Sequence, residues 1–241
     1  MPLELRPLEL RRGERGVVLV GHRGAAALAP ENSLAAIDAA AAAGVDAVEV
    51  DVLRREDGEL VLAHGPDVPR DAPLLDDAFE QIHRLGLAVQ VDVKVGGNET
   101  AIVDALRRHD LDSRAFVSSF SLPILRAFAL AEAELPRSFT YPEDRLGATE
   151  RRLLRPAVRP GLAVLRALAP KRLPRWLRAG GAQAATLNWA VASPAAVAAC
   201  HASGAAVYVW TVNDAALANT LVESGIDGII TDDPRILAAR S

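Results

Sequence analysis

Short runs of β-branched residues alternate with alanine-rich stretches of helical periodicity along the whole chain. This pattern is typical of repeated strand–helix units, in which parallel strands form a sheet that helices cover. The runs predict strands at residues 17–20, 46–52, 88–94, 115–119, 137–140, 184–187, 205–210 and 227–231. The stretches between them predict helices at 32–43, 75–85, 99–109, 122–132, 149–155, 193–203, 214–223 and 234–239.

Eight such units are the number that closes a (β/α)₈ (TIM) barrel. The 241 residues are a typical length for one barrel, so residues 1–241 are expected to form a single α/β domain. Polar residues at the expected helix starts and glycines after the expected helix ends agree with these boundaries. The expected starts are Asn32, Ser193 and Asn213 or Asp214, and the expected stops are Gly44, Gly204 and Gly225.

Two segments interrupt the regular rhythm. Residues 58–64 (GELVLAH) predict an extra short strand that ends on a histidine. Residues 145–182 string arginines and prolines through an apolar pattern that is longer than an ordinary loop. We expect this second segment to be a lid, a peripheral membrane contact, or an amphipathic excursion packed on the barrel rim.

Composition narrows the class of partner and the compartment. Acidic and basic residues are interspersed and leave a net charge of −4, which favours a small-molecule partner over nucleic acid. The single cysteine, Cys200, rules out an intrachain disulfide and is expected to be a small packed residue. Residues 1–16 alternate leucine with charge, and no apolar run reaches the length of a membrane span, so a cytoplasmic location is expected.

Two acids share one face of the strand at 46–52. Glu49 and Asp51 are two residues apart, so a strand points both to the same side while the valines between them face the other way. Two buried carboxylates repel each other and lose hydration unless a cation offsets them. A hard divalent ion would do so, although a solvated strand end with ordinary acids explains the pair equally well.

The strand at 88–94 also has two charged residues on one face, Asp92 and Lys94, which are two positions apart. Asp92 would complete a metal site and Lys94 would contact a phosphate oxygen; a salt-bridged pair inside the barrel is the alternative. Because charged pairs recur on two neighbouring strands, the alternative is weaker than it would be for either strand alone.

Two histidines lie where barrel active sites are built. His22 and Arg23 directly follow the first strand, at its carboxyl end, and His64 ends the extra short strand. Two imidazoles facing each other across the mouth suit a general acid and a general base. Phe120 and Trp210 follow other strands and are expected either to wall the mouth or to pack in the core.

At these residues the chain closely resembles the glycerophosphodiester phosphodiesterase family. The resemblance covers nearly the whole barrel, and the order of its motifs is more specific than any one of them. The matching segments are His22–Gly24, Pro30–Ser33, Gly44–Val52, Asp57–His64, Ser119–Phe120, Val209–Asn213 and Gly225–Asp232.

The resemblance implies a metal-dependent hydrolase that converts glycerophosphodiesters to glycerol 3-phosphate and an alcohol. It implies that His22 and His64 act as the acid–base pair and that Arg23 and Lys94 hold the phosphate. Glu49 and Asp51 would bind Mg²⁺ or Ca²⁺, and Asp92 would be the third ligand.

The chain departs from the family pattern at three places. Asp92 stands where the family usually has glutamate, so its carboxylate is one methylene shorter. His64 is followed by Gly65 and Pro66 before Asp67, rather than directly by an aspartate. The insertion that many members carry after this histidine is almost absent, which predicts a more open mouth.

Two other functions stay open at this point. The same site would serve a lysophospholipase D-type hydrolase if the leucines and Trp176 in residues 145–182 covered an acyl chain. A barrel that binds phosphoesters without turning them over is the non-enzymatic alternative, and the shorter Asp92 keeps it open.

Overall fold

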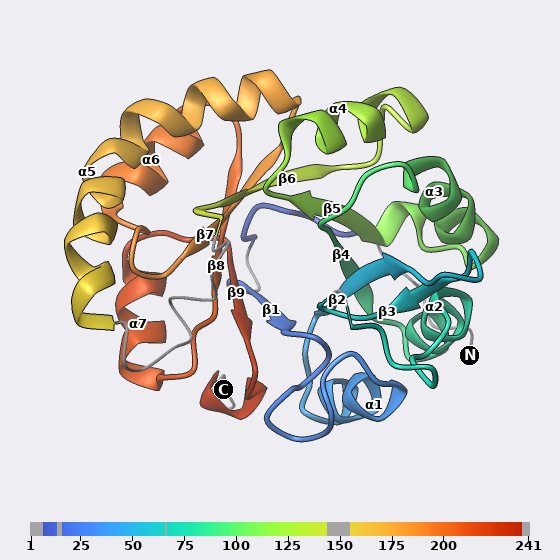
Figure 1. The fold of residues 1–241 in the computed structure, drawn as a ribbon. Helices are drawn as coiled ribbons and strands as arrows, with labels where there is room; N and C mark the ends of the chain where they lie inside the picture. Colours follow the sequence, from blue (N-terminus) through green and yellow to red (C-terminus); the bar gives the residue numbers. More distant parts are fainter. Residues whose placement is uncertain (1–6, 14–15, 66, 144–154, 238–241) are drawn as a thin grey trace.

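The computed structural model describes residues 7–13, 16–65, 67–143 and 155–237, with the backbone alone for 155–159. Parallel strands close into a ring, because β1 (Val18–Gly21) pairs with both β2 (Ala47–Arg54) and β9 (Gly228–Thr231). Figure 1 shows this ring enclosed by helices. The other strands of the ring are β4 (Ala88–Val93), β5 (Ala115–Ser119), β6 (Arg137–Tyr141), β7 (Ala184–Asn188) and β8 (Ala206–Trp210). The predicted TIM barrel is confirmed.

The extra strand expected at 58–64 is also present. It is β3 (Leu60–Leu62), which pairs antiparallel with the far end of β2. A helix follows most strands of the ring. The sequence-based boundaries agree with the observed ones to within a few residues, except that α5 replaces the helix expected at 149–155 and a 3₁₀ turn stands at the start of the helix expected at 234–239. The helices are α1 (Leu34–Ala42), α2 (Leu75–Arg84), α3 (Glu99–Arg108), α4 (Leu122–Ala131), α5 (Arg155–Gly180), α6 (Pro194–Ala202) and α7 (Ala215–Glu223), with 3₁₀ turns η1 (Asp112–Arg114) and η2 (Pro234–Leu237).

Alternation along each strand separates two cores. Outward-facing residues such as Val48, Val50 and Val91 pack under the helices in the main hydrophobic core. Inward-facing residues at the amino ends of the strands, such as Phe116 and Tyr208, form a smaller apolar cluster inside the ring. Polar inward-facing residues follow toward the carboxyl ends. The barrel therefore has an apolar floor and a polar mouth.

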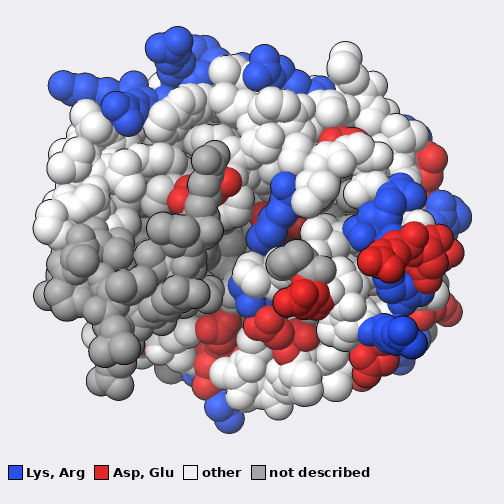
Figure 2. All heavy atoms as spheres, in the orientation of Figure 1, with Lys and Arg blue, Asp and Glu red and all other residues white. Residues whose placement is uncertain are grey.

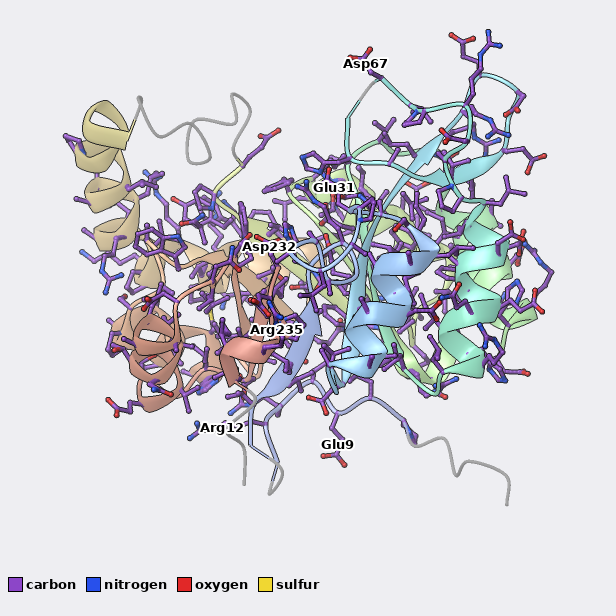
Figure 3. All side chains as sticks on the ribbon, turned by 90° about the horizontal axis from the view of Figure 1, so that it is seen from below. Glu9, Arg12, Glu31, Asp67, Asp232 and Arg235 are labelled. Atoms are coloured by element: carbon purple, nitrogen blue, oxygen red, sulfur yellow. The ribbon has the colours of Figure 1, made fainter. Side chains whose placement is uncertain are left out.

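The N-terminal segment seals the floor. Leu8 and Leu10 pack against the inner cluster, and the hydroxyl of Tyr208 donates a hydrogen bond to the carbonyl of Leu10 (3.1 Å). A side chain at Gly228 would place its Cβ 2.3 Å from the Tyr208 ring, so only glycine fits there. Figure 3 shows Glu9 and Arg12 at this end and Glu31 and Asp232 toward the opposite one.

Helix α5 occupies most of the segment that interrupts the sequence pattern. Its Leu173 and Leu177 are buried in the main core, and Trp176 packs against the rings of Phe139 (5.6 Å) and Tyr141 (5.0 Å) between centroids. The second half of this segment is thus an ordinary covering helix of the barrel. In Figure 3 the first turns of α5 stand above the rim at the mouth end.

The helix expected at 149–155 falls almost entirely outside the described residues, and α5 begins at Arg155. Residues 145–154 of the expected lid lie outside them too, so a lid or membrane contact stays a prediction. None of the helices in the described part of the chain is long and apolar enough to cross a membrane.

Cys200 is buried in α6. Its burial, and secondly the charge of Asp227, raise the pKa of its thiol to about 12. It is a packed residue, as expected.

Candidate active site

Three carboxylates from neighbouring strands lie together in the barrel mouth. Glu49 and Asp51 point inward from β2, and the parallel register places Asp92 of β4 beside Asp51. Each residue offers one oxygen to a group whose members all lie within 4.8 Å of one another, and all three residues are buried. The structure therefore brings together the residues expected as metal ligands, including the shorter Asp92.

Two cations face this cluster. Lys94 Nζ contacts Asp51 and lies 3.2 Å from Asp92 Oδ2, and Arg23 Nε lies 3.1 Å from Asp51 Oδ2. Three carboxylates against two cations leave negative charge in excess. Burial first, and the neighbouring charge of Asp51 second, raise the pKa of Glu49 to about 7.

This donor set fits a hard divalent cation. Mg²⁺ and Ca²⁺ take carboxylate oxygens as ligands. The charge of such an ion would offset the excess negative charge that contributes to the raised pKa of Glu49. Glu49, Asp51 and Asp92 are the residues that would hold such an ion.

The turn after β1 is shaped around Arg23. Its backbone is left-handed (φ 51°), and its N–H donates to Glu49 Oε2 (2.8 Å). Its guanidinium also donates to Glu31 Oε2 (2.7 Å). Gly24 follows with φ 86°, and a Cβ there would lie 2.6 Å from Ala36, so the turn requires glycine. The tight turn holds Arg23 against the carboxylates.

Asn32 serves this site rather than the start of a helix. The sequence predicts Asn32 as a helix start, but Ser33 is the cap of α1, its hydroxyl accepting from the N–H of Ala36. Asn32 is left-handed (φ 53°), a conformation that asparagine tolerates better than most residues. Its amide donates to Asp51 Oδ2 (3.0 Å) and its Oδ1 accepts from the Asp51 N–H (3.1 Å). Asn32 therefore fixes the orientation of Asp51.

His22 is held by the last strand of the barrel. Its Nδ1 lies 2.6 Å from Asp232 Oδ1, just beyond β9, and Asn213 donates to the other Asp232 oxygen (2.5 Å). Burial alone would lower the pKa of His22, but the charge of Glu49 and the hydrogen bond with Asp232 outweigh it and raise that pKa. The protonated imidazole is thus favoured, with Nε2 left for a reacting group.

His64 approaches from the loop after β3. Its Nδ1 lies 3.0 Å from Asp51 Oδ2, and its Nε2 lies 3.1 Å from a terminal guanidinium nitrogen of Arg23. Its Nδ1 also lies 3.0 Å from Lys94 Nζ, so His64 bridges the carboxylate of Asp51 and the ammonium group of Lys94. Burial would raise the pKa of Asp51, but the hydrogen bond with His64 and the charge of Lys94 hold it below its usual range.

The two histidines, the two cations and the three carboxylates line one cavity of about 90 Å³. Phe120 and Trp210 form part of its wall, edge to face with ring centroids 6.4 Å apart, so both line the mouth rather than only the core. Gln90 and Thr140 also line it. Gln90 Oε1 and Thr140 Oγ1 are buried and have no hydrogen-bond partner among the described residues. The cavity thus offers two acceptors to a hydroxyl-bearing ligand.

A larger groove of about 680 Å³ continues from this cavity. The two share His22, Arg23 and Trp210. The groove runs past Trp189, which is 46% exposed, toward the loop after β9.

Several residues of the site were not predicted from the sequence. Asp232, Asn32, Gln90 and Thr140 are polar residues whose importance depends on which strands are neighbours. Two signals were available: Asn32 and Asp232 lie in segments that match the family's motifs, and Asp232 follows the closing strand, which must pair with the strand before His22.

Comparison with known proteins agrees with this geometry. Residues 22–74 and 76–236 match a family model described as the glycerophosphoryl diester phosphodiesterase family. A glycerophosphodiester phosphodiesterase of Caldanaerobacter subterraneus is 26% identical, in an alignment that covers 91% of this chain and 96% of that protein. A probable glycerophosphodiester phosphodiesterase 2 of Mycobacterium tuberculosis is 28% identical, over 95% of this chain and 91% of that protein.

Solved structures share the fold. A glycerophosphoryl diester phosphodiesterase described as putative, from Silicibacter pomeroyi, superposes with a TM-score of 0.77 at 21% identity, over 95% of each chain. A phosphodiesterase of Oleispira antarctica, solved in complex with the product sn-glycerol-3-phosphate, has a TM-score of 0.72 at 22% identity. That match covers 93% of this chain and 97% of the other.

Proposed function

This chain belongs to the glycerophosphoryl diester phosphodiesterase family and is a phosphodiesterase, and on that premise we propose that it hydrolyses small glycerophosphodiesters to glycerol 3-phosphate and an alcohol with the aid of Mg²⁺ or Ca²⁺. The observation that carries the proposal is the meeting of two histidines and two cations around three buried carboxylates. A phosphodiester is an anion, and its cleavage needs stabilisation of negative charge and two proton transfers. The cations would stabilise the charge, and the two histidines would transfer the protons.

The phosphate would lie between the cations and the metal ligands. Arg23 and Lys94 are placed to bind its non-bridging oxygens, as the family resemblance implied. An ion held by Glu49, Asp51 and Asp92 would supply further positive charge for these oxygens in the transition state.

The two histidines would divide the proton transfers. His64 Nε2 would take a proton from the attacking hydroxyl, which is either water or the hydroxyl next to the ester on glycerol. His22 would give its proton to the oxygen of the leaving alcohol, since its pKa is raised and Asp232 holds its Nδ1. If the glycerol hydroxyl attacks, a cyclic phosphate forms, and water opens it with the two roles reversed.

The glycerol arm would enter the smaller cavity. Gln90 Nε2 donates to Ser118 Oγ (3.0 Å), and this leaves Gln90 Oε1 to accept from a ligand. Thr140 Oγ1 is available in the same way. Two buried acceptors suit the hydroxyl groups of glycerol, because burying them without a partner costs about 1–3 kcal/mol each.

The test is release of glycerol 3-phosphate from a panel of soluble glycerophosphodiesters with Mg²⁺, with Ca²⁺ and with a chelator. We expect metal-dependent turnover, and His22→Ala should lower kcat at least about 100-fold because it removes the proton donor. His109→Ala is the matched control, since His109 contacts Asp76 on the outer surface and lines neither the cavity nor the groove. No turnover on any diester, with any metal, would favour a barrel that only binds phosphoesters.

Lysophospholipids belong in the same panel. Leu173, Leu177 and Trp176, which belong to the segment that suggested an acyl-chain cover, pack between α5 and the outer face of the barrel. Activity on lysophospholipids without activity on soluble diesters would select that alternative, in which residues 145–182 cover the acyl chain.

A further inference from the structure

We propose that the outer face of α5 binds the surface of an anionic lipid membrane. This interaction is independent of the proposed hydrolysis and gives the protein a second partner. Three features of this side of the barrel support it: a long segment without acidic residues, a row of exposed cations on one helix face, and an exposed aliphatic side chain in the same row.

Acidic residues are missing from the helices on one side of the barrel. Residues 151–213 hold nine Lys and Arg but none of the 31 Asp and Glu of the chain. This stretch includes α5 and α6, and α4, which packs beside α5, also lacks both acids. Figure 2 shows basic side chains along its upper left edge, over α5. Charges that are interspersed elsewhere in the chain are thus segregated here.

One face of α5 presents its cations to solvent. Lys171, Arg175 and Arg178 are exposed. Their spacing of four and three residues places them on one side of the helix, opposite the side that buries Leu173 and Leu177. In the described part of the chain none of these three cations forms an ion pair with a carboxylate. Like charges at these spacings repel one another, and an anionic surface would relieve that repulsion.

An aliphatic side chain in this row favours lipid over nucleic acid as the anionic partner. Val164 is 57% exposed and lies two helical turns before Lys171, on the same face of α5. A nucleic acid would neutralise the cations through its phosphates but offers an aliphatic side chain no apolar phase. A bilayer offers both, because anionic headgroups meet the cations and the acyl boundary beneath them takes up apolar side chains.

The distribution of acids sets the orientation on the membrane. Helices α1, α2 and α3 expose acidic residues, among them Asp38, Asp77 and Asp104. Figure 1 shows these helices on the lower and right sides of the ring, whereas α5 covers its left and upper sides. An anionic surface would attract α5 and repel the opposite side. A bilayer that lies against the outside of α5 leaves the mouth open, so soluble diesters can still enter it.

The test is sedimentation of the full chain with vesicles of phosphatidylcholine alone, or of phosphatidylcholine mixed with phosphatidylglycerol. We expect binding to the anionic vesicles only, and added salt should weaken it. Replacing Lys171, Arg175 and Arg178 together by Gln should weaken binding about 100-fold, because each basic residue near an anionic surface strengthens it about fivefold. These side chains are exposed, so the thermal unfolding midpoint should stay unchanged.

The control is a second triple variant with the same change of net charge. Arg84, Arg107 and Arg108 are exposed arginines of α2 and α3, on the acidic side of the barrel. Replacing these three by Gln should change vesicle binding less than twofold. Equal losses in the two triple variants would overturn the proposal, as would a wild type that does not bind the anionic vesicles.

A pair of valine variants tests the apolar contact. Val164→Gln should weaken vesicle binding severalfold, whereas Val95→Gln should not, since Val95 is equally exposed (56%) but follows β4, away from α5. Duplex DNA offered in competition tests the other anionic partner. Vesicles should displace it, and DNA that binds more tightly than vesicles, through the same three cations, would overturn the proposal.

Discussion

At the scale of single residues, the contact between His22 and Asp232 contributes to the protonation state of His22, the proposed acid. Replacing Asp232 by Asn removes a negative charge that raises the pKa of His22. His22 then loses its proton at lower pH, so the alkaline limb of the kcat–pH profile should move to lower pH. We also expect kcat at neutral pH to fall about tenfold, because a poorly held acid transfers its proton less efficiently.

The measurement is the pH profile of kcat for the wild type and Asp232→Asn. Asp104→Asn, on the outer face of α3, is the matched control and should leave the profile unchanged. A loss of kcat with no displacement of the alkaline limb would contradict a role through the pKa of His22.

The individual chemical residues were the part most accessible to prediction. His22, His64, Glu49 and Asp51 follow from motif order and from the two-residue period of a strand, because both are local properties of the chain. Asn32 shows the limit. Its residue type suits either a helix cap or a left-handed turn, and only the position of Asp51 in space decides between them.

At the scale of elements, the registers of β2, β4 and β5 place the carboxylates that we propose as metal ligands. Asp92 lies beside both Asp51 and Ser118, and the Ser118 hydroxyl donates to Asp92 Oδ1 (2.6 Å). Ser118→Ala should leave Asp92 free to rotate and weaken Mg²⁺ binding about tenfold, the usual effect of losing a group that orients a ligand.

Calorimetric titration with Mg²⁺ checks this prediction. Ser138→Ala is a matched control, because Ser138 is also a buried, inward-facing serine but contacts Thr186 on the next strand (2.7 Å). Equal affinities in the two variants would show that Ser118 does not orient the ligand.

Strand positions were predicted well, because each strand of the ring is a short apolar run between clear breaks. Helix α5 was not, since Pro160, Pro170 and Pro174 lie within it. Proline in a helix interior normally argues for a break. Here the tertiary packing of Leu173, Trp176 and Leu177 outweighs that local preference.

At the scale of the whole molecule, the excess charge in the mouth links stability to pH and to metal. Glu49 has an ordinary pKa of 4.5 and a folded-state pKa of about 7. The folded chain thus binds more protons than the unfolded chain between these values, and stability falls as pH rises through them. His22, whose folded-state pKa is raised, acts in the same direction.

With a chelator present, the free energy of unfolding should therefore fall between pH 5 and pH 8, by up to about 3 kcal/mol from Glu49. Added Mg²⁺ should restore stability most at pH 8, where Glu49 is ionised. Urea denaturation at both pH values checks this, and Glu49→Gln should remove the part of the slope that comes from Glu49. A metal-free protein that is more stable at pH 8 would contradict the charge balance described here.

The general architecture was within reach of the sequence, because counting strand–helix units needs no three-dimensional information. The groove was not, since its lining residues come from segments as distant as Glu31, Trp189 and Asp233. Only closure of the ring makes them neighbours.

The pairing of the first and last strands also governs when the enzyme becomes active. His22 leaves the ribosome early, while the carboxylate that holds it is 210 positions further along the chain. A nascent chain would carry the turn of Arg23 and the acidic cluster long before the side chain of His22 has the carboxylate that holds it. A break in the chain anywhere between β1 and β9 would likewise put His22 and Asp232 on separate fragments, and only association of the two fragments would bring them together again.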